Sequence, residues 1–332
     1  MATLAVNNPT LLDLAKRSDP DGRIATIVEM LNETNEILDD MTWIEGNLVT
    51  GHRTTIRTGL PTPTWRKLYG GVQPTKSTTA QITDNTGMLE AYAEVDKALA
   101  DLNGNTAEFR LSEDRPHIEA MSQEIADTIF YGNEGVEPEA FTGLSPRFND
   151  LNAENGGNII DAKGSGSDNA SIWLIVWSPN TVHGIVPKGS QAGLQMTDKG
   201  QVTIEDVDGN GGRMEAYRTH YRWDAGLTVR DWRYVVRIAN IDKSLLTPDL
   251  STGADLMDLM FQATELPPSL QTGRPVFYMS RMVRTMLYRQ AAYKIRQSTL
   301  TIDDAGGKKI MTFQGIPIKR VDALAADEAQ VT

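Results

Sequence analysis

Cysteine is absent from the 332-residue chain, so disulfide bonds, thiolate nucleophiles and thiolate metal sites are all excluded. The sequence also contains no run of about 18 apolar residues, which is the length of a membrane-spanning helix. Its first residues lack the basic segment followed by an apolar core that marks an export signal. Together these absences favour a protein that folds in the cytoplasm.

Histidine is scarce, and no motif of a known catalytic type occurs. The four histidines stand apart from one another and outside any HExxH pattern: His52, His117, His183 and His220. The glycine-rich stretches contain neither the phosphate-binding GxxxxGKS pattern nor a GxSxG nucleophile motif. The sequence therefore predicts no catalytic residue, no cofactor and no metal site.

One acidic stretch comes near a metal-binding pattern. Residues 206–211 place oxygen-bearing side chains at positions 1, 3 and 5 of an EF-hand calcium loop, with glycine at position 6. Position 12 requires a bidentate glutamate and is Tyr217 here. Since the flanking residues have the pattern of strands, a tight hairpin turn is the favoured interpretation and a cation bound at Asp206 to Asn210 is the alternative.

Acidic residues outnumber basic ones by 44 to 32, which gives a formal net charge of −12. Such a charge opposes nucleic-acid binding as the main activity, because neutralising phosphates requires a basic surface. The basic residues are dense in one stretch only, the arginines at 213, 218, 222, 230, 233 and 237. Three interpretations of this stretch stay open: a solvated sheet face, a contact with carboxylates of another chain, and a contact with enclosed nucleic acid.

The clearest single element is a helix predicted over residues 113–131. Its apolar residues recur at helical spacing, at Ile118, Met121, Ile125 and Ile129. Ser112 or Asp114 can cap its start, and Pro116 is acceptable in a first turn. Gly132 is expected to end it with a positive φ angle.

The segment before this helix has few large apolar residues. Residues 1–45 contain two short helical patterns, at 11–16 and 24–38. Residues 43–95 then form threonine-rich runs on either side of a glycine- and proline-rich middle, which predicts a long hairpin. Because such a hairpin has no core of its own, a neighbour has to stabilise it.

The remaining chain alternates between strands and helices. Residues 171–177 predict a strand that is buried on both faces. Large apolar residues fall at the odd positions of Leu227 and Val229 and then at the even positions 232, 234, 236 and 238, and this change of parity predicts a bulge near Arg230 or Asp231. We expect a surface loop at 149–170 and an acidic tail at 325–332 that only neighbouring chains can order. The other expected elements are strands within 201–243, a helix at 254–264, a strand at 275–279, a helix at 281–296 and a hairpin turn at 303–307.

Three of these segments resemble the major capsid proteins of tailed double-stranded DNA phages. The helix is followed by Gly132, the turn Gly135-Val-Glu-Pro138 and the tetrad Phe-Thr-Gly-Leu, as at the exit of the family's long spine helix. The hairpin tip at 60–72 resembles the Pro-x-x-Trp-Arg-x-Leu-x-x-Gly-Val tips of short-tailed, podovirus-like phage capsids. The sequences at 278–281 and 315–318 resemble the domain that gathers at capsomer centres.

The resemblance implies the α+β Hong-Kong-97-like capsid fold. The expected division is an N-terminal arm at 1–45, an extended loop at 46–95, a peripheral domain at 96–140 and 201–243, and an axial domain at 141–200 and 244–332. In the commoner arrangement the segments resembling 172–187 and 212–240 come at the C-terminus, whereas here they precede the Gly-x-Pro strand. The resemblance thus implies a permuted variant of the fold.

The function that the resemblance implies is self-assembly of hexamers and pentamers into an icosahedral shell around the phage DNA, in the virion. The acidic charge suits a container that does not grip its contents. Expected partners are a scaffolding protein, a portal protein and a cementing protein, with no membrane contact. Subunit contacts are expected at Trp65, Arg66, Lys67, Tyr69, Arg218 and Arg222. The alternatives are an encapsulin-like nanocompartment shell and a soluble α+β enzyme.

Overall fold

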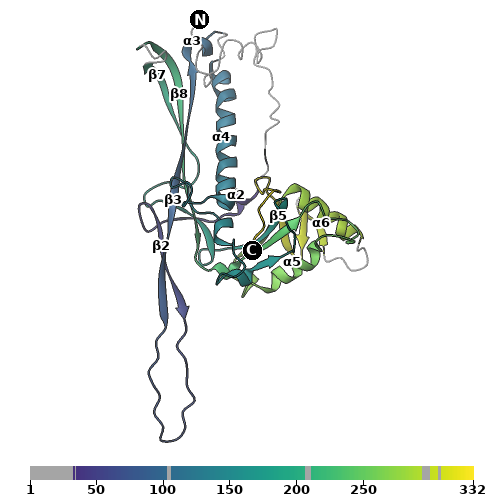
Figure 1. The fold of residues 1–332 in the computed structure, drawn as a ribbon. Coiled ribbons are helices and arrows are strands. Elements are labelled where there is room, and N and C mark those ends of the chain that lie inside the picture. The colour runs from purple at the N-terminus through teal and green to yellow at the C-terminus, as the bar shows by residue number, and fades with distance from the viewer. Residues whose placement is uncertain (1–32, 34, 103–105, 206–210, 294–299, 306–307) are drawn as a thin grey trace. The chain divides into compact units, whose positions relative to one another are not determined.

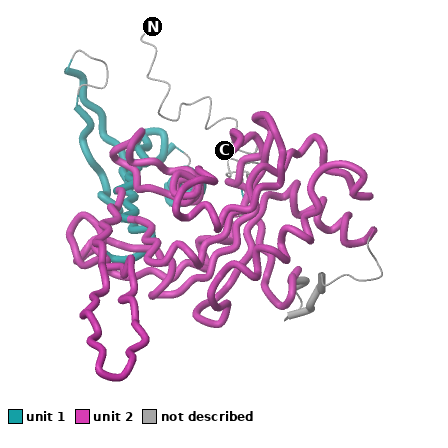
Figure 2. The backbone as a smooth tube through the Cα atoms, turned by 60° about the horizontal axis from the view of Figure 1, so that its bottom comes forward, with its two compact units in different colours: residues 1–33, 88–125, 191–224 teal, residues 34–87, 126–190, 225–332 magenta. Residues whose placement is uncertain are grey.

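The computed structural model of the chain describes residues 33, 35–102, 106–205, 211–293, 300–305 and 308–332 (Figure 1). The helical pattern predicted at 11–16, most of the one at 24–38 and residues 206–210 of the candidate calcium loop lie outside them. The chain divides into two compact units, shown in different colours in Figure 2: residues 34–87, 126–190 and 225–332 in the larger, and residues 1–33, 88–125 and 191–224 in the smaller. Among the described helices, none has the length and apolar character that a membrane span requires.

Three long elements contribute residues to both units: β3 (Thr78–Asp96), α4 (Thr106–Tyr131) and β8 (Arg213–Val229). The smaller unit also contains α3 (Lys97–Ala100) and β7 (Gln195–Glu205). The other helices and strands belong to the larger unit: α2 (Ile37–Asp40), β1 (Trp43–Glu45), β2 (Gly51–Gly59), β4 (Ile159–Asp161), β5 (Asn169–Trp177), β6 (Val182–Val186), β9 (Val235–Asp242), α5 (Leu256–Glu265), β10 (Arg274–Met279), α6 (Arg281–Tyr293), β11 (Leu300–Ala305), β12 (Lys308–Phe313) and β13 (Ile316–Arg320).

Strand β5 is the centre of the larger unit. It pairs antiparallel with β10 and with β9, and all nine of its residues are buried, as predicted for 171–177. Beyond β10 the sheet continues through β13, β12 and β11, and β11 and β12 form the hairpin predicted around 303–307. Beyond β9 lies the short parallel strand β4. A run of apolar residues long enough to be buried on both faces thus predicted the central strand correctly.

Helices α5 and α6 contribute to one hydrophobic core with this sheet. Their buried residues pack with side chains of β5, β9 and β10, and Val283, Leu287 and Ala291 of α6 point into that core as predicted. Asp255 caps α5 by accepting a hydrogen bond from the backbone N–H of Asp258. Both helices therefore begin where the sequence pattern placed them, to within two residues.

Helix α4 is longer at its start than predicted. It includes Thr106, so Pro116 lies in its interior and neither Ser112 nor Asp114 is its cap. The added turns are held by Phe109, which is buried in a cluster with Val95, Leu99 and Ala100. This packing offsets the backbone hydrogen bond that a proline inside a helix removes. Met121, Ile125 and Ile129 are buried as predicted, whereas Ile118 is exposed.

Gly132 ends α4 for a reason other than the one expected. Gly132 does not have a positive φ angle, so the predicted left-handed conformation is wrong. A Cβ atom at this position would instead lie 2.4 Å from the carbonyl oxygen of Phe141 and 2.6 Å from that of Thr128. Glycine is required because the backbone after the helix folds back against it.

Two predictions in the strand region are also wrong. β8 continues to Val229 and is followed by a short 3-10 turn over Trp232–Tyr234 before β9, so the change of parity marks a turn and no bulge. Asp231 caps that turn by accepting from the N–H of Arg233. The supposed surface loop at 149–170 contains the buried Asn158 and the strand β4. Asn158 donates to the carbonyl oxygen of Val235, which ties this segment to β9.

Candidate subunit-contact sites

The tip of the β2–β3 hairpin, drawn in Figure 1 as a long loop, is an exposed part of the larger unit. β2 and β3 pair antiparallel from Gly51–Asn85 to Gly59–Thr78, as the hairpin prediction required. Residues 60–77, all of which the structure describes, form neither helix nor strand. Trp65 and Tyr69 are 101% and 102% exposed, and Leu68 is 86% exposed. An exposed cluster of large apolar side chains on an extended loop is typical of a protein contact surface.

A tight turn shapes this tip. The N–H of Gly70 donates to the carbonyl oxygen of Lys67 at 3.0 Å, and Tyr69 has a φ angle of 61°. This left-handed conformation is costly for a tyrosine, by roughly 1 kcal/mol. Arg66, Lys67 and Tyr69 are thereby presented together, with Arg66 and Lys67 exposed as well. The sequence analysis expected subunit contacts at these residues, which stays a prediction, and it expected a glycine- and proline-rich tip without placing this particular turn.

The root of the hairpin is fixed much more firmly than its tip. Arg147 forms an ion pair with the buried Asp84 of β3 at 2.8 Å, and it also donates to the carbonyl oxygens of Thr142, Gly143 and Leu227. Asn47 bonds both the N–H and the carbonyl oxygen of Arg53 on β2, at 2.7 and 2.8 Å. Both strands are thus anchored to the larger unit while the tip has no such anchor. Sequence reasoning missed Arg147 and Asp84, whose separation along the chain leaves no local pattern.

The arginine-rich strand β8 carries the other predicted contact residues, in the smaller unit. Arg218 pairs with Glu94 at 2.6 Å, and its guanidinium lies over the ring of Tyr92, 5.7 Å from the ring centre. This distance is within the roughly 6 Å of a cation–π contact. Arg222 pairs with Asp224 at 3.0 Å, and this hydrogen bond raises the pKa of the Arg222 guanidinium above its usual value. Both arginines therefore have acidic partners within their own chain.

The same unit contains a similar pair that the sequence did not single out. Arg110 of α4 donates to Asp198 of β7 at 2.6 Å and lies 5.1 Å from the ring centre of Tyr217. The hydrogen bond from Arg110 is the main cause that lowers the pKa of the Asp198 carboxyl. Arg110 thus bridges α4 and β7 within the smaller unit.

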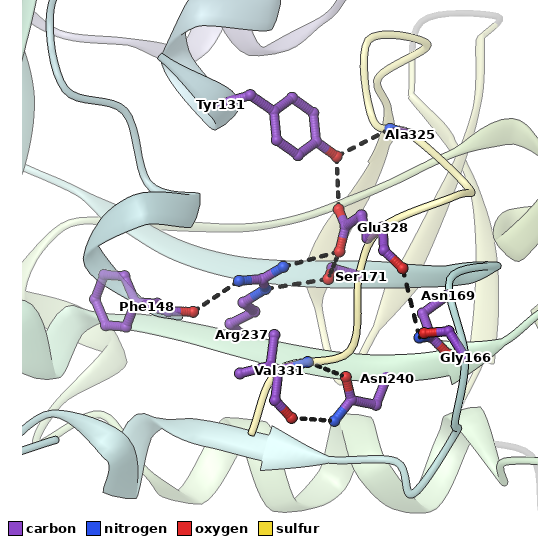
Figure 3. A network of polar contacts seen from close by, with 10 residues as sticks. All are labelled: Tyr131, Phe148, Gly166, Asn169, Ser171, Arg237, Asn240, Ala325, Glu328 and Val331. Atoms are coloured by element: carbon purple, nitrogen blue, oxygen red, sulfur yellow. Dashed lines mark hydrogen bonds and ion pairs between the residues drawn. The ribbon is translucent and has the colours of Figure 1, made fainter. Parts of the chain in front are cut away.

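Arg237, the last member of that stretch, is buried in the larger unit. Figure 3 shows it beside the C-terminal segment, where it donates to the carboxylate of Glu328, the hydroxyl of Ser171 and the carbonyl oxygen of Phe148. Asn240 holds both the N–H and the carbonyl oxygen of Val331, at 2.8 and 2.9 Å. The expectation that 325–332 is ordered only by neighbouring chains is therefore wrong, because these side chains bind it within one unit.

Within the described residues, no group of three or more His, Asp or Glu side chains is arranged to hold a metal ion. The chemistry of both units is that of ion pairs, buried networks and exposed contact surfaces. The comparison with known proteins agrees with this character: a family model of the major capsid protein GP7 matches residues 19–332. The chain belongs to this major capsid protein family.

A solved structure of bacteriophage Epsilon15 contains a chain with 42% identity to this capsid protein, over 100% of both chains and with a TM-score of 0.79. Chains with lower similarity come from the capsid of the native GTA particle, with 10% identity, 71% and 99% coverage and a TM-score of 0.46, and from the capsid of bacteriophage JBD30, with 9% identity, 90% and 96% coverage and a TM-score of 0.44. No curated protein matches the sequence.

The capsid protein thus has the α+β Hong-Kong-97-like fold that the sequence predicted, and it is a component of the virion that assembles into the shell. The permuted order of segments, the four-part domain division and the individual contact residues stay predictions. Of the segments that resemble the family, the tip at 60–72 is an exposed loop and Gly132 directly follows the end of α4.

Proposed function

We propose that this capsid protein acts as a purely structural subunit, without catalytic activity, and that its hairpin tip binds a neighbouring subunit of the shell. The supporting observation is the exposure of Trp65 and Tyr69, which have essentially no protein around them in their own chain. Two aromatic rings bury a large apolar area when a partner covers them, and such residues dominate the energetics of many interfaces. A capsid repeats the same contact many times, so a modest contact per subunit stabilises the whole shell.

The charged residues of the tip indicate that the partner surface is acidic. Arg66 and Lys67 are exposed and cationic in a protein with a net charge of −12, so another copy of the chain offers a predominantly acidic surface. Electrostatic complementarity of this kind directs orientation and speeds association. We extend the proposal to Arg218 and Arg222, with a smaller effect, because Glu94 and Asp224 already pair with them.

The proposal includes partners beyond the shell itself. The enclosed molecule is double-stranded DNA, contacted without sequence preference, as the net negative charge favours containment over tight binding. Assembly is proposed to use a separate scaffolding protein and a portal protein, with a cementing protein as a further partner. A precursor shell then expands as DNA enters, with the hairpin hinging and α4 bending, in a segment order that is a permuted form of the fold.

The test compares two tip variants with a control. W65A/Y69A and R66E/K67E are expressed with the neighbouring phage genes, and T64A, which changes an exposed tip residue without a large or charged side chain, is the control. We expect both double variants to fold with unchanged thermal midpoints and to yield few or no closed particles by negative-stain electron microscopy. Normal particle yields from both would contradict the tip contact. Particles that contain a cargo protein instead of DNA would contradict the DNA-enclosing role.

A further inference from the structure

Helices α5 and α6 present outer faces of opposite charge. The 13 residues of α6 include Arg281, Arg284 and Arg289 and no acidic residue. The 10 residues of α5 include Asp258 and Glu265 and no basic residue. In a chain with a net charge of −12, a helix with three arginines and no acid is a local exception. The two helices belong to one core, so both faces lie on the larger unit.

Each face also carries exposed rings or large apolar groups. We define the α6 basic face as Arg284, Tyr288, Arg289 and Tyr293, and the α5 acidic face as Asp258, Phe261, Glu265 and Leu266. Tyr288 and Tyr293 are 49% and 65% exposed, and Phe261 and Leu266 are each 37% exposed. The buried residues Val283, Leu287 and Ala291 occupy the opposite side of α6. Tyrosine and arginine are enriched in protein interfaces, where the ring supplies apolar area and the guanidinium supplies directed hydrogen bonds.

A buried side chain fixes these two helices in place. Gln290 of α6 is fully buried, and its amide oxygen accepts from the N–H of Leu256 at the start of α5. Its amide nitrogen donates to the carbonyl oxygens of Thr247 and Ala254, each at 3.1 Å. A surface held by a satisfied buried network needs little ordering when a partner binds, which lowers the entropic cost of association.

The charged groups of the two faces are not paired with each other. Among the described residues, no ion pair within 4.0 Å joins Arg284 or Arg289 to a carboxylate, and Glu265 takes part in none. Asp258 accepts a hydrogen bond from Gln262 on its own helix and still faces solvent. Arg281 differs, since it pairs with Asp322 at 2.8 Å, and it is left out of the basic face for that reason.

We propose that the α6 basic face of one subunit binds the α5 acidic face of a second copy of this chain. Charge complementarity identifies the occupant, because each face offers what the other lacks and every copy carries both. Enclosed DNA is a weaker candidate for the basic face, since it would leave the acidic, apolar face of α5 without a partner and would itself be repelled by Asp258 and Glu265. A contact between two different patches of identical chains repeats from subunit to subunit and closes when the rotation permits.

A charge-swap series tests the contact. R284E/R289E and D258K/E265K each place like charges opposite one another in the shell, whereas the quadruple variant that combines all four changes restores opposite charges in inverted order. We expect each double variant to raise the critical concentration for shell assembly by at least about tenfold, and the quadruple variant to recover most of that loss. Assembly is followed by light scattering and negative-stain electron microscopy of the full chain expressed with its neighbouring genes.

The controls separate this contact from folding, from net charge and from the hairpin tip. K188E/K243E makes the same change of charge as R284E/R289E at two exposed lysines of the larger unit and is expected to assemble normally. If a reversal variant does not fold, R284Q/R289Q and D258N/E265Q replace it, with a smaller expected rise in critical concentration. Assembly of wild-type particles confirms the shell function independently of this contact.

Two outcomes would overturn the proposal. The first is normal assembly of either folded double variant; if R284E/R289E assembles normally and its particles contain less DNA, the basic face belongs to the enclosed nucleic acid. The second is a quadruple variant that folds and yet assembles no better than the doubles.

Discussion

Arg237 and Glu328 are 91 positions apart in the sequence, yet their side chains form an ion pair of 2.8 Å in which both partners are almost fully buried. Tyr131 donates to the second carboxylate oxygen of Glu328 at 2.6 Å, and the Arg237 guanidinium lies 5.1 Å from the ring centre of Trp173. Burial and the adjacent Glu328 charge hold the pKa of the Tyr131 hydroxyl well above its usual range, so it remains a donor. The C-terminal segment is thus part of the core of the larger unit.

Removing one partner of this pair should be costly. We expect Glu328→Gln to lower the free energy of unfolding by about 3 kcal/mol, because it leaves the Arg237 charge buried and uncompensated. The matched double variant R237M/E328L removes both charges and should lose clearly less. Urea denaturation of the unassembled chain measures both. If Glu328→Gln were as stable as the wild type, the pair would not hold the tail.

The pH dependence of stability should reveal His183. Its ring is buried on β6, 5.8 Å from the ring of His52, and burial lowers its pKa to about 4, with the charges of His52 and Arg230 as further causes. The unfolded chain, with a histidine pKa near 6.5, binds this proton more readily than the folded chain does. The contribution of His183 to the free energy of unfolding is therefore fully present above pH 6.5. It is lost as the pH falls toward 4, by roughly 3 kcal/mol in total.

The variant His183→Gln isolates this contribution from the carboxylates that titrate in the same range. We expect its free energy of unfolding to fall less steeply than that of the wild type between pH 6.5 and 4, whatever its stability at pH 8. Parallel curves for the variant and the wild type would show that His183 titrates in the folded chain much as it does in the unfolded one.

Two glycines provide a matched steric test. Gly132→Ala introduces a methyl group within 2.4 Å of the Phe141 carbonyl oxygen and should destabilise the chain by about 1–3 kcal/mol. Gly157 has no heavy atom within 4 Å of the corresponding position, and its φ angle is not positive. Gly157→Ala should therefore be neutral or stabilising by a few tenths of a kcal/mol, roughly the entropic effect on the unfolded chain. Equal effects in thermal unfolding would contradict the close-approach argument.

Local periodicity predicted most of the elements of this fold. Three elements are determined by patterns among residues that are close in the sequence: the apolar run at 171–177, the helical spacing of Val283, Leu287 and Ala291, and the glycine- and proline-rich tip. The errors share a different origin. Pro116 lies inside a helix because Phe109 packs against residues before it in the chain, and the acidic tail is ordered because Arg237 and Asn240 bind it. Partners so far apart leave no pattern that a local reading of the sequence detects.

The same limit applies to the contact surfaces. Trp65 and Tyr69 are exposed on a hairpin for which the sequence predicted no core of its own. The opposite charges of α5 and α6 can also be identified from the sequence once the bounds of the two helices are known. What the sequence does not show is which charges are already neutralised, as Arg218 is by Glu94 and Arg222 by Asp224. That distinction needs three-dimensional distances.

The exposure of Trp65 has an optical consequence. Of the six tryptophans, Trp173, Trp177 and Trp223 are buried and Trp43 and Trp232 are partly covered, so Trp65 is the one whose indole is fully in water. Its emission lies at the red end of the spectrum while the tip is free and shifts to shorter wavelength when another protein covers the ring. Shell formation in this capsid protein thus carries its own fluorescent signal, readable in real time without an added label.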